Sequence, residues 1–175
     1  MTAGGFKMER PRRKPNRLHG YDYSTAGTYF ITICTQNREC SLSQIIGMND
    51  NVGDGFPVPK LTEAGIISDK YIKSIHDKFS SVTVENYVIM PNHIHMILYL
   101  KNGTGDPSPT IGNIIGWYKY IVTKEINNVR DLPSVKFFQR SFHDHIIRND
   151  KEFQMIYKYI DENPINWEND CFYCN

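Results

Sequence analysis

Apolar residues recur along this chain at two different spacings, and each spacing predicts a different element. Alternation of apolar and polar residues is typical of a strand with one buried face, whereas apolar residues three and four positions apart share one face of a helix. Alternating, β-branched and aromatic runs predict strands at 29–35, 82–90, 93–100 and 142–147. Pro91 and Asn92 separate the second and third of these strands and suit the centre of a tight turn, which predicts an antiparallel hairpin.

Three segments with helical spacing each begin at a residue that can cap a helix with its side-chain oxygen. The predicted starts are Thr62, Thr110 and either Asn149 or Asp150. The third helix should end near Asn163, because the residue before a proline is disfavoured in helical geometry. The residues expected to face inward are Ala64, Ile67, Tyr71, Ile75 and Phe79 in the first helix and Phe153, Ile156, Tyr157 and Ile160 in the third.

The order of the elements predicts the fold. Strand, helix, strand, strand, helix and strand, followed by an added helix, is the split βαβ arrangement of ferredoxin-like α+β domains. We therefore expect a mainly antiparallel sheet with helices on one face and an additional C-terminal helix. Residues 41–60 are rich in turn-forming residues and predict a surface excursion with room for a short hairpin. The predicted organisation is an N-terminal arm at 1–16, one domain at 17–167 and a C-terminal tail at 168–175.

The composition supports a single domain with its own core. The chain has 175 residues, of which 40% are hydrophobic and 13% aromatic, and this excludes a disordered chain or a coiled coil. The apolar runs are too short to cross a bilayer, and the start of the chain lacks the apolar core of a secretion signal. Because four cysteines in a chain of this length do not make a disulfide framework, we expect a reducing cytoplasm.

The cysteines could alternatively form a metal site, although this interpretation is weaker. Cys171 and Cys174 could bind zinc together with Cys34 and Cys40. The four cysteines do not form two Cys-x-x-Cys hooks, as such a zinc site would require. Incidental thiols are therefore the favoured interpretation.

Charge is balanced overall but unevenly distributed. The 20 Lys and Arg residues against 19 Asp and Glu residues give a net charge of +1, which does not indicate a polyanionic partner for the chain as a whole. The first 20 residues nevertheless contain a basic group of Lys7, Arg10, Arg12, Arg13, Lys14 and Arg17. Such an arm can neutralise phosphates, and a solvated, mobile terminus is the equally weighted alternative.

Two histidines at the start of the third predicted strand, 93–100, could hold a cation. Side chains alternate along a strand, so His93 and His95 project from one face and Ile94 from the other. Two imidazoles on one face can converge on a metal ion. On its own, the pattern is also typical of histidines that only pack or hydrogen-bond.

One tyrosine of the third helix lies outside the predicted inward stripe. Residues four apart lie about 40° from each other around a helix, so Tyr159 and Asn163 share a face. Tyr157 belongs to the inward stripe and is expected in the core. Tyr159 is therefore free to act as a nucleophile, or it is an ordinary amphipathic surface tyrosine.

Four motifs occur in the order found in one known family. Pro91-Asn92-His93-Ile94-His95 resembles the histidine–hydrophobic–histidine (HUH) motif of the single-tyrosine HUH transposases, an insertion-sequence-200-like family. The run 159–164 resembles their nucleophile helix. The runs 27–32 and 138–149 resemble the opening strand and the last strand of the branch called REP-associated tyrosine transposases. The similarity covers about residues 17–167.

The resemblance implies an activity and a set of site residues. It implies a metal-dependent endonuclease and strand transferase that cleaves single-stranded DNA beside a hairpin through a 5′-phosphotyrosine. Tyr159 would be the nucleophile, His93 and His95 would bind Mg²⁺ or Mn²⁺, and Asn163 would be a third ligand where relatives often have glutamine. A cation bound by two imidazoles and an amide keeps open positions for phosphate and water.

The same resemblance implies a DNA partner and a cellular location. A DNA hairpin with a single-stranded flank is the expected ligand, and a bacterial cytoplasmic, nucleoid-associated location is expected. In some relatives two subunits share each site, so that both a monomer and a homodimer are consistent with the sequence. The candidate DNA contacts are Arg12, Arg13, Lys14, Arg17, Lys119, Arg140 and Arg148, with Trp117, Tyr118 and Tyr120 as stacking candidates of which some are core.

Two other functions remain open from the sequence. One is a protein of the same fold that binds DNA hairpins without cutting them. The other is a zinc hydrolase that uses His93 and His95 with His143 or His145, although a hydrogen-bonded strand histidine is the favoured interpretation of the last two.

Overall fold

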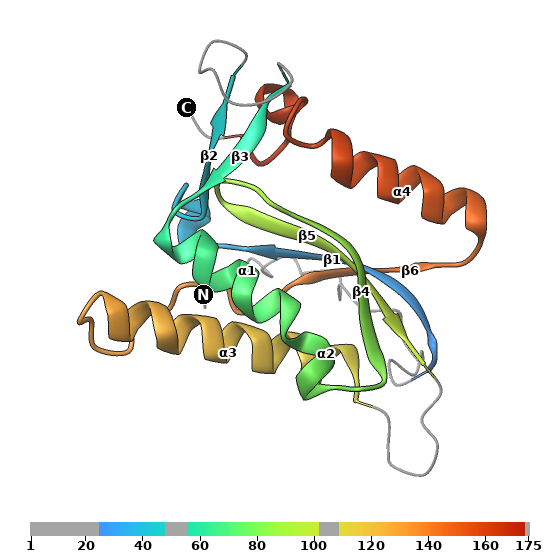
Figure 1. Ribbon diagram of the computed structural model, residues 1–175, viewed down its shortest axis with the longest axis horizontal. Coiled ribbons are helices and arrows are strands. Elements are labelled where there is room, and N and C mark those ends of the chain that lie inside the picture. The colour runs from blue at the N-terminus through green and yellow to red at the C-terminus, as the bar shows by residue number, and fades with distance from the viewer. Residues whose placement is uncertain (1–24, 48–55, 102–108, 174–175) are drawn as a thin grey trace, which may run out of the picture.

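The computed structural model describes residues 25–47, 56–101 and 109–173, and it contains the predicted sheet. The four strands are β1 (Gly27–Cys34), β4 (Val82–Ile89), β5 (His93–Leu100) and β6 (His143–Ile147). They lie in the order β4-β5-β1-β6, and every neighbouring pair is antiparallel (Figure 1). The ferredoxin-like arrangement predicted from the order of elements is therefore confirmed.

Two turn-rich regions behave as the sequence predicts. Met90 N–H donates to the His93 carbonyl at 2.9 Å, which closes the hairpin around Pro91 and Asn92. The excursion after β1 contains a separate antiparallel hairpin, β2 (Ser43–Ile46) with β3 (Val58–Leu61).

The helices begin at the predicted caps. These helices are α1 (Glu63–Lys73), α3 (Ile111–Val129) and α4 (Asp150–Glu162). The Thr62 and Thr110 hydroxyls each accept from a backbone N–H at 3.2 Å, and Asn149 Oδ1 accepts from Glu152 N–H at 2.9 Å. These bonds satisfy donors that have no partner within the helix.

Two details of the predicted helices are wrong. The first helix is interrupted at Ser74, whose ψ of 1° breaks the ladder between α1 and the short α2 (Ile75–Lys78), and Phe79 lies beyond α2. Asn163 has helical dihedrals, φ −58° and ψ −42°, although a proline follows it. The helix therefore ends at the predicted place, but the conformation of Asn163 itself is not the extended one.

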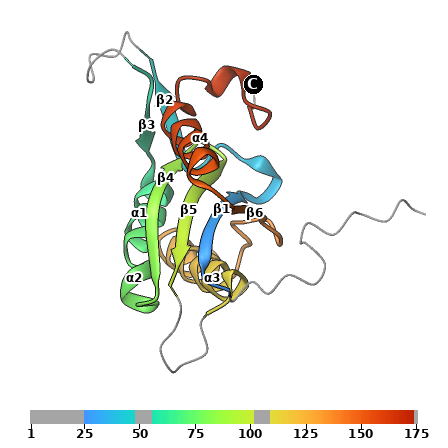
Figure 2. The same ribbon diagram turned by 90° about the vertical axis from the view of Figure 1, so that its right-hand side faces the viewer.

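The sheet separates two apolar clusters. The larger one lies between the sheet and α1 and α3, and it contains the even-numbered apolar residues of β5 from Ile94 to Leu100. The smaller one lies on the opposite face, where Ile97 and Ile147 pack against Ile160 of α4. Figures 1 and 2 show α3 and α4 on opposite sides of the sheet.

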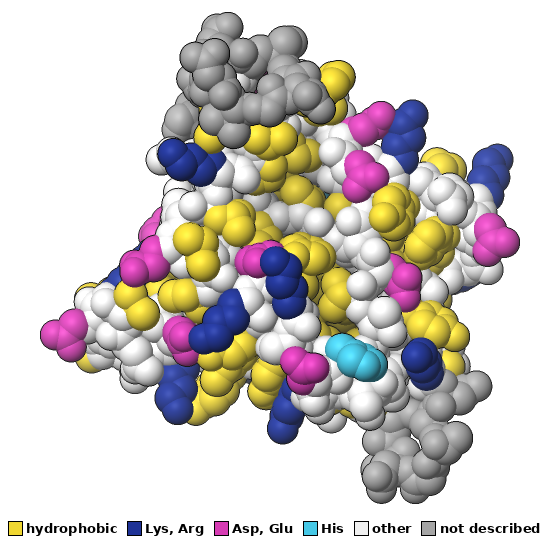
Figure 3. All heavy atoms as spheres, in the orientation of Figure 1, with side chains coloured by type: hydrophobic (Ala, Val, Ile, Leu, Met, Phe, Trp, Pro, Cys, Tyr) yellow, Lys and Arg dark blue, Asp and Glu magenta, His cyan; other side chains and the backbone are white. Residues whose placement is uncertain are grey.

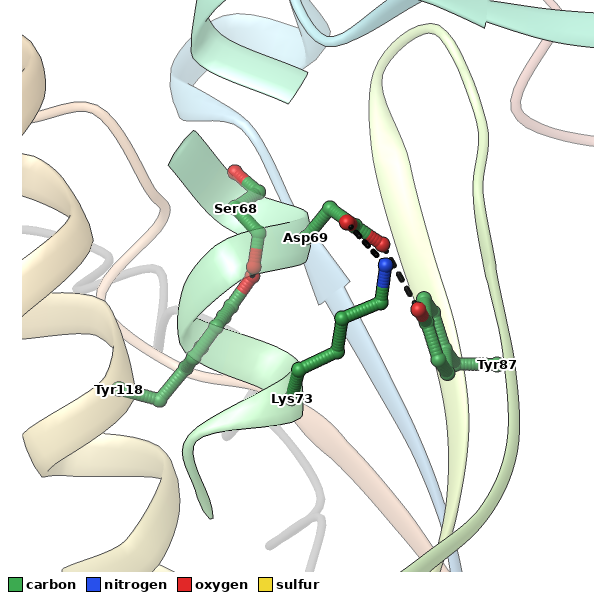
Figure 4. Close-up of polar contacts among 5 residues, drawn as sticks. All are labelled: Ser68, Asp69, Lys73, Tyr87 and Tyr118. Atoms are coloured by element: carbon green, nitrogen blue, oxygen red, sulfur yellow. Dashed lines mark hydrogen bonds and ion pairs between the residues drawn. The ribbon is translucent and has the colours of Figure 1, made fainter. Parts of the chain in front are cut away.

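Polar contacts attach α1 to both β4 and α3 (Figure 4). The Asp69 carboxylate accepts from Tyr87 Oη and from Lys73 Nζ, each at 2.7 Å. Tyr118 Oη in α3 donates to the Ser68 carbonyl at 3.3 Å. Burial raises the pKa of both tyrosines, so both hydroxyls remain protonated donors.

Helix α4 covers its face of the sheet with a narrow stripe. Ile160 is buried, while Phe153 and Ile156 are half-buried against the smaller cluster. The side chain of Tyr157 is 36% exposed, so its predicted place in the core is wrong.

None of the helices in the described parts of the chain combines the length and the apolar run that crossing a bilayer requires.

A pair of glycine substitutions tests how α1 is seated. A Cβ at Gly65 would overlap the backbone carbonyl of Leu42, whereas a Cβ at Gly116 in α3 meets no atom within 4 Å. We expect Gly65→Ala to lower the free energy of unfolding by about 1–3 kcal/mol, because the backbone must shift. Gly116→Ala should raise it by about 0.5–1 kcal/mol, because alanine loses less entropy in a helix. Urea denaturation measures both, and an unchanged Gly65→Ala protein would contradict this packing.

Candidate active site

The histidine pair lies at the start of β5 on the face covered by α4. His93 and His95 are 0% and 2% exposed, and their ring centroids are 4.4 Å apart. Residues paired across neighbouring strands share a face, so Thr32 of β1, which is opposite His95, points to the same side. The pair therefore occupies a polar site next to the smaller apolar cluster.

Asn92 fixes the tautomer of His93. The Asn92 amide donates to the Phe172 carbonyl at 2.7 Å and to the Arg38 carbonyl at 3.3 Å. Its Oδ1, 2.9 Å from His93 Nδ1, must therefore accept from Nδ1–H. The Nε2 lone pair of His93 is left free, buried and without a hydrogen-bond partner.

His95 lies between a hydroxyl on each side. Its Nδ1 is 2.8 Å from Thr32 Oγ1, and its Nε2 is 3.3 Å from Tyr159 Oη. When Nδ1–H donates to Thr32, Nε2 accepts from Tyr159. This tautomer presents Nε2 of His95 toward Tyr159 of α4.

Burial keeps both imidazoles neutral. Burial lowers the pKa of His93 to about 4, and the Asp170 carboxylate offsets only part of that effect. Burial, and then the repulsion from His93 that would arise if both rings were protonated, lowers the pKa of His95 well below 6.5. Neutral imidazole is the form that binds a metal ion.

Tyr159 reaches the histidine pair from α4 of the same chain. Its ring stands edge-on to Phe30 with the centroids 6.1 Å apart, and the side chain is 43% exposed. Partial burial raises the pKa of Tyr159, and the charge of Asp170 raises it further. The phenol is therefore protonated at neutral pH unless a positive charge is added beside it.

Asn163 is brought to the same place by the last turn of α4. The side chain is 2% exposed, and Nδ2 donates to Asp170 Oδ2 at 3.1 Å. Because a carboxylate only accepts, this contact orients the amide, and Oδ1 is left buried without a partner.

Asp170 belongs to the site, although the sequence did not predict a role for it. One ring nitrogen from each of His93 and His95 and one Asp170 oxygen lie within 4.8 Å of one another. Asp170 follows the predicted boundary at 167, and its only signal in the sequence is membership of an acidic C-terminal run. The boundary remains a prediction, but residues beyond it contact the site.

The segment 167–173, which we call the C-terminal cover, encloses the imidazoles. Trp167 and Phe172 lie 6.0 and 4.5 Å from the His93 ring, centroid to centroid. Tyr173 packs on Trp167 at 5.4 Å, and the Arg38 guanidinium lies 4.9 Å from the Phe172 centroid. These contacts separate the ring nitrogens from bulk water.

The donor atoms fit a small divalent cation. Two imidazole nitrogens, an amide oxygen and a carboxylate oxygen are a mixed set suited to Mn²⁺ and acceptable to Mg²⁺. Two of these atoms, His93 Nε2 and Asn163 Oδ1, are buried without a hydrogen-bond partner. Isolated buried polar atoms are costly, and a bound cation would satisfy both.

The second histidine pair lies apart from this site. His145 Nε2 contacts Glu152 Oε1 at 2.7 Å, so that histidine is hydrogen-bonded, as expected. Thr32 pairs with His95 on one side and His143 on the other, which places those histidines two strands, about 10 Å, apart. Within the described residues, the grouped metal-ligating side chains include neither His143 nor His145.

The candidate DNA contacts are only partly described. Lys119 donates to the backbone carbonyls of Gln139 and Arg140. Arg140 and Arg148 are exposed. The predicted contacts Arg12, Arg13, Lys14 and Arg17 lie outside the described residues, and on the face shown in Figure 3 basic and acidic side chains are interspersed.

The aromatic side chains of α3 divide between core and surface. Tyr118 is buried and Trp117 packs against the core, as expected for some of this group, whereas Tyr120 is 65% exposed.

Of the cysteines, Cys34 and Cys171 are free thiols. Cys40 is disulfide-bonded, so the expectation of an incidental thiol is wrong at this position.

Three known proteins resemble this chain. An uncharacterized protein of Haemophilus influenzae (strain ATCC 51907 / DSM 11121 / KW20 / Rd) is 33% identical over 92% of this chain and 93% of its own length. A protein of the same organism, provisionally named a REP-associated tyrosine transposase, is 25% identical over 82% of this chain and 73% of its own length. A solved REP-associated tyrosine transposase bound to a REP hairpin has a TM-score of 0.53 at 20% identity, covering 86% of this chain and 73% of that chain, and it shows a shared fold.

The family described as "Transposase IS200 like" matches residues 63–163. The matched stretch includes the histidine pair, Tyr159 and Asn163, and it is more than half of the chain. The resemblance inferred from the motifs is confirmed: this chain belongs to the IS200-like transposase family.

Proposed function

We propose that this protein is a metal-dependent single-stranded DNA endonuclease and strand transferase that cleaves beside a DNA hairpin through a 5′-phosphotyrosine intermediate. The observation that carries the proposal is the 3.3 Å contact between Tyr159 Oη and His95 Nε2. A nucleophile candidate and a metal-ligand candidate meet there within one chain. Membership of a transposase family supports DNA as the substrate.

The proposed ligands are His93, His95 and Asn163. A divalent cation held there would act as a Lewis acid that stabilises negative charge on the phosphate oxygens. Asn92 and Thr32 hold the imidazoles through their Nδ1 atoms, 2.9 and 2.8 Å away. These two residues therefore position the ligands, in the way that outer partners of metal-bound histidines generally do.

Tyr159 supplies the attacking oxygen. Its Oη forms a bond to the phosphorus while the bond from phosphorus to the 3′ oxygen breaks. The phenol loses one proton and the departing 3′ oxygen gains one, so the step is balanced. The product keeps the phosphate on the 5′ end as a tyrosyl ester, which a second 3′ hydroxyl can attack to rejoin DNA.

A hairpin substrate is supported by one structural relative. The solved REP-associated tyrosine transposase is bound to a REP hairpin, and it shares this fold. Exposed Arg140 and Arg148, together with the basic arm, are the proposed backbone contacts. The Tyr159–His95 contact lies within one chain, so the proposed site does not require a second subunit.

The alternative of hairpin binding without cleavage is favoured by one observation. His93 and His95 are 0% and 2% exposed beneath the C-terminal cover, which leaves little room for a phosphodiester in this conformation. Cleavage requires the cover or Tyr159 to shift when DNA binds.

Replacement of the nucleophile separates these two functions. With labelled hairpin DNA carrying a single-stranded flank and Mn²⁺ or Mg²⁺, we expect the wild type to form a covalent adduct that survives denaturation. Tyr159→Phe should form none, because only its hydroxyl is removed. Tyr157→Phe is the matched control, since Tyr157 is a tyrosine of the same helix that is 36% exposed, against 43% for Tyr159, and it should form the wild-type amount. Hairpin binding without any wild-type adduct would favour the non-cleaving alternative.

Metal removal gives a second test. EDTA should abolish adduct formation, and Mn²⁺ or Mg²⁺ should restore it, whereas hairpin binding measured by gel shift should persist. An adduct that forms undiminished in EDTA would contradict metal dependence. Cleavage that needs zinc, leaves no adduct and is unaffected by Tyr159→Phe would instead indicate a hydrolase.

A further inference from the structure

We propose that Asp170 is a ligand of the divalent cation, so that the C-terminal cover forms part of the metal site. The inference rests on the cation site of the proposed function and adds a ligand to it. Asp170 follows Asn163 by seven residues and belongs to a different segment from every other proposed ligand.

The position of the carboxylate supports this role. One oxygen of Asp170 lies within 4.8 Å of a ring nitrogen of each histidine. Oδ2 accepts from Asn163 Nδ2 at 3.1 Å, and Oδ1 accepts from Phe172 N–H at 2.7 Å. Each oxygen has lone pairs left, and these two bonds hold the carboxylate next to the imidazoles.

No basic side chain neutralises Asp170 among the ion pairs of the described residues. The carboxylate is instead half-buried beside the two histidine rings and the amide of Asn163. A half-buried charge with no ionic partner is unfavourable, and a divalent cation at this point would supply the missing partner.

Two further polar atoms of these residues have no hydrogen-bond partner. His93 Nε2 and Asn163 Oδ1 make no hydrogen bond within the protein. Bulk water cannot replace the missing partners, because the two residues are only 0% and 2% exposed. Asp170 orients the Asn163 amide so that its oxygen, and not its nitrogen, is available. The carboxylate thus contributes an oxygen of its own and directs a second oxygen.

The added ligand affects which metal the site prefers. Two imidazoles and an amide are all neutral, and imidazole nitrogens favour later transition metals such as Ni²⁺ and Zn²⁺. Mg²⁺ is usually held through one or two carboxylates, and Mn²⁺ also accepts oxygen ligands. Asp170 would therefore increase the affinity for Mg²⁺ and Mn²⁺ relative to that for Ni²⁺.

The test is metal binding by the full-length protein without DNA. Free Mn²⁺ is measured by electron paramagnetic resonance, and Ni²⁺ is measured by calorimetry. Asp170→Asn should raise the Kd for Mn²⁺ at least about tenfold, since even outer-shell partners contribute that much, and should raise the Kd for Ni²⁺ less. Glu168→Gln is the matched control, because it removes the same charge at an exposed position two residues away and should leave both Kd values unchanged.

A further variant distinguishes a ligand from a residue that only holds the cover closed. Phe172→Ala removes the ring that packs on His93 but leaves the Asp170 carboxylate in place. If Asp170→Asn and Phe172→Ala weaken Mn²⁺ and Ni²⁺ binding to the same extent, Asp170 only positions the cover and the inference is overturned.

His95→Ala separates failure of this inference from failure of the proposed function. If His95→Ala abolishes Mn²⁺ binding while Asp170→Asn binds as the wild type does, the cation site remains and the role of Asp170 is overturned. If the wild type binds no Mn²⁺, or His95→Ala binds it normally, the cation site itself is wrong and the Asp170 inference is wrong with it.

Discussion

Alternation of side chains along β5 places an apolar core and a polar site on opposite faces of a single strand. Ile94, Met96 and Leu98 contribute to the cluster beneath α1 and α3. His93 and His95 point the other way, toward α4. A shift of one residue in the pairing with β1 would bury the site residues in the core and expose the core residues. The register of β5 therefore determines both the stability of the fold and the presence of a site.

The polar face is stabilised by specific hydrogen bonds and not by apolar burial alone. Both Nδ1 atoms of the histidine pair have a partner, Asn92 on one side and Thr32 on the other. Nε2 of His95 contacts Tyr159 Oη, whereas Nε2 of His93 has no hydrogen-bond partner. This asymmetry orients the rings and leaves the Nε2 lone pair of His93 available, whereas that of His95 accepts from Tyr159 and becomes available to a metal ion when the phenol turns away. The low pKa values produced by burial keep those lone pairs unprotonated at neutral pH.

Features that depend on local spacing could be predicted from the sequence, whereas features set by distant contacts could not. The strands, the helix caps and the common face of His93 and His95 follow from local rules. Asp170 could not be found in this way, because its place depends on contacts such as that between Asn92 and Phe172, 80 residues apart. The prediction that Tyr157 is buried was wrong. Helical spacing shows which side of α4 is apolar, but the sheet packed against α4 determines how many residues of that side are buried.

Peptide mass mapping of the DNA-linked protein identifies the residue that attacks the phosphate. After incubation with hairpin DNA and Mn²⁺, followed by denaturation and digestion with protease and nuclease, we expect a nucleotide attached through its 5′ phosphate to the peptide containing Tyr159. Attachment at any other residue, or through a 3′ phosphate, would show that Tyr159 is not the nucleophile.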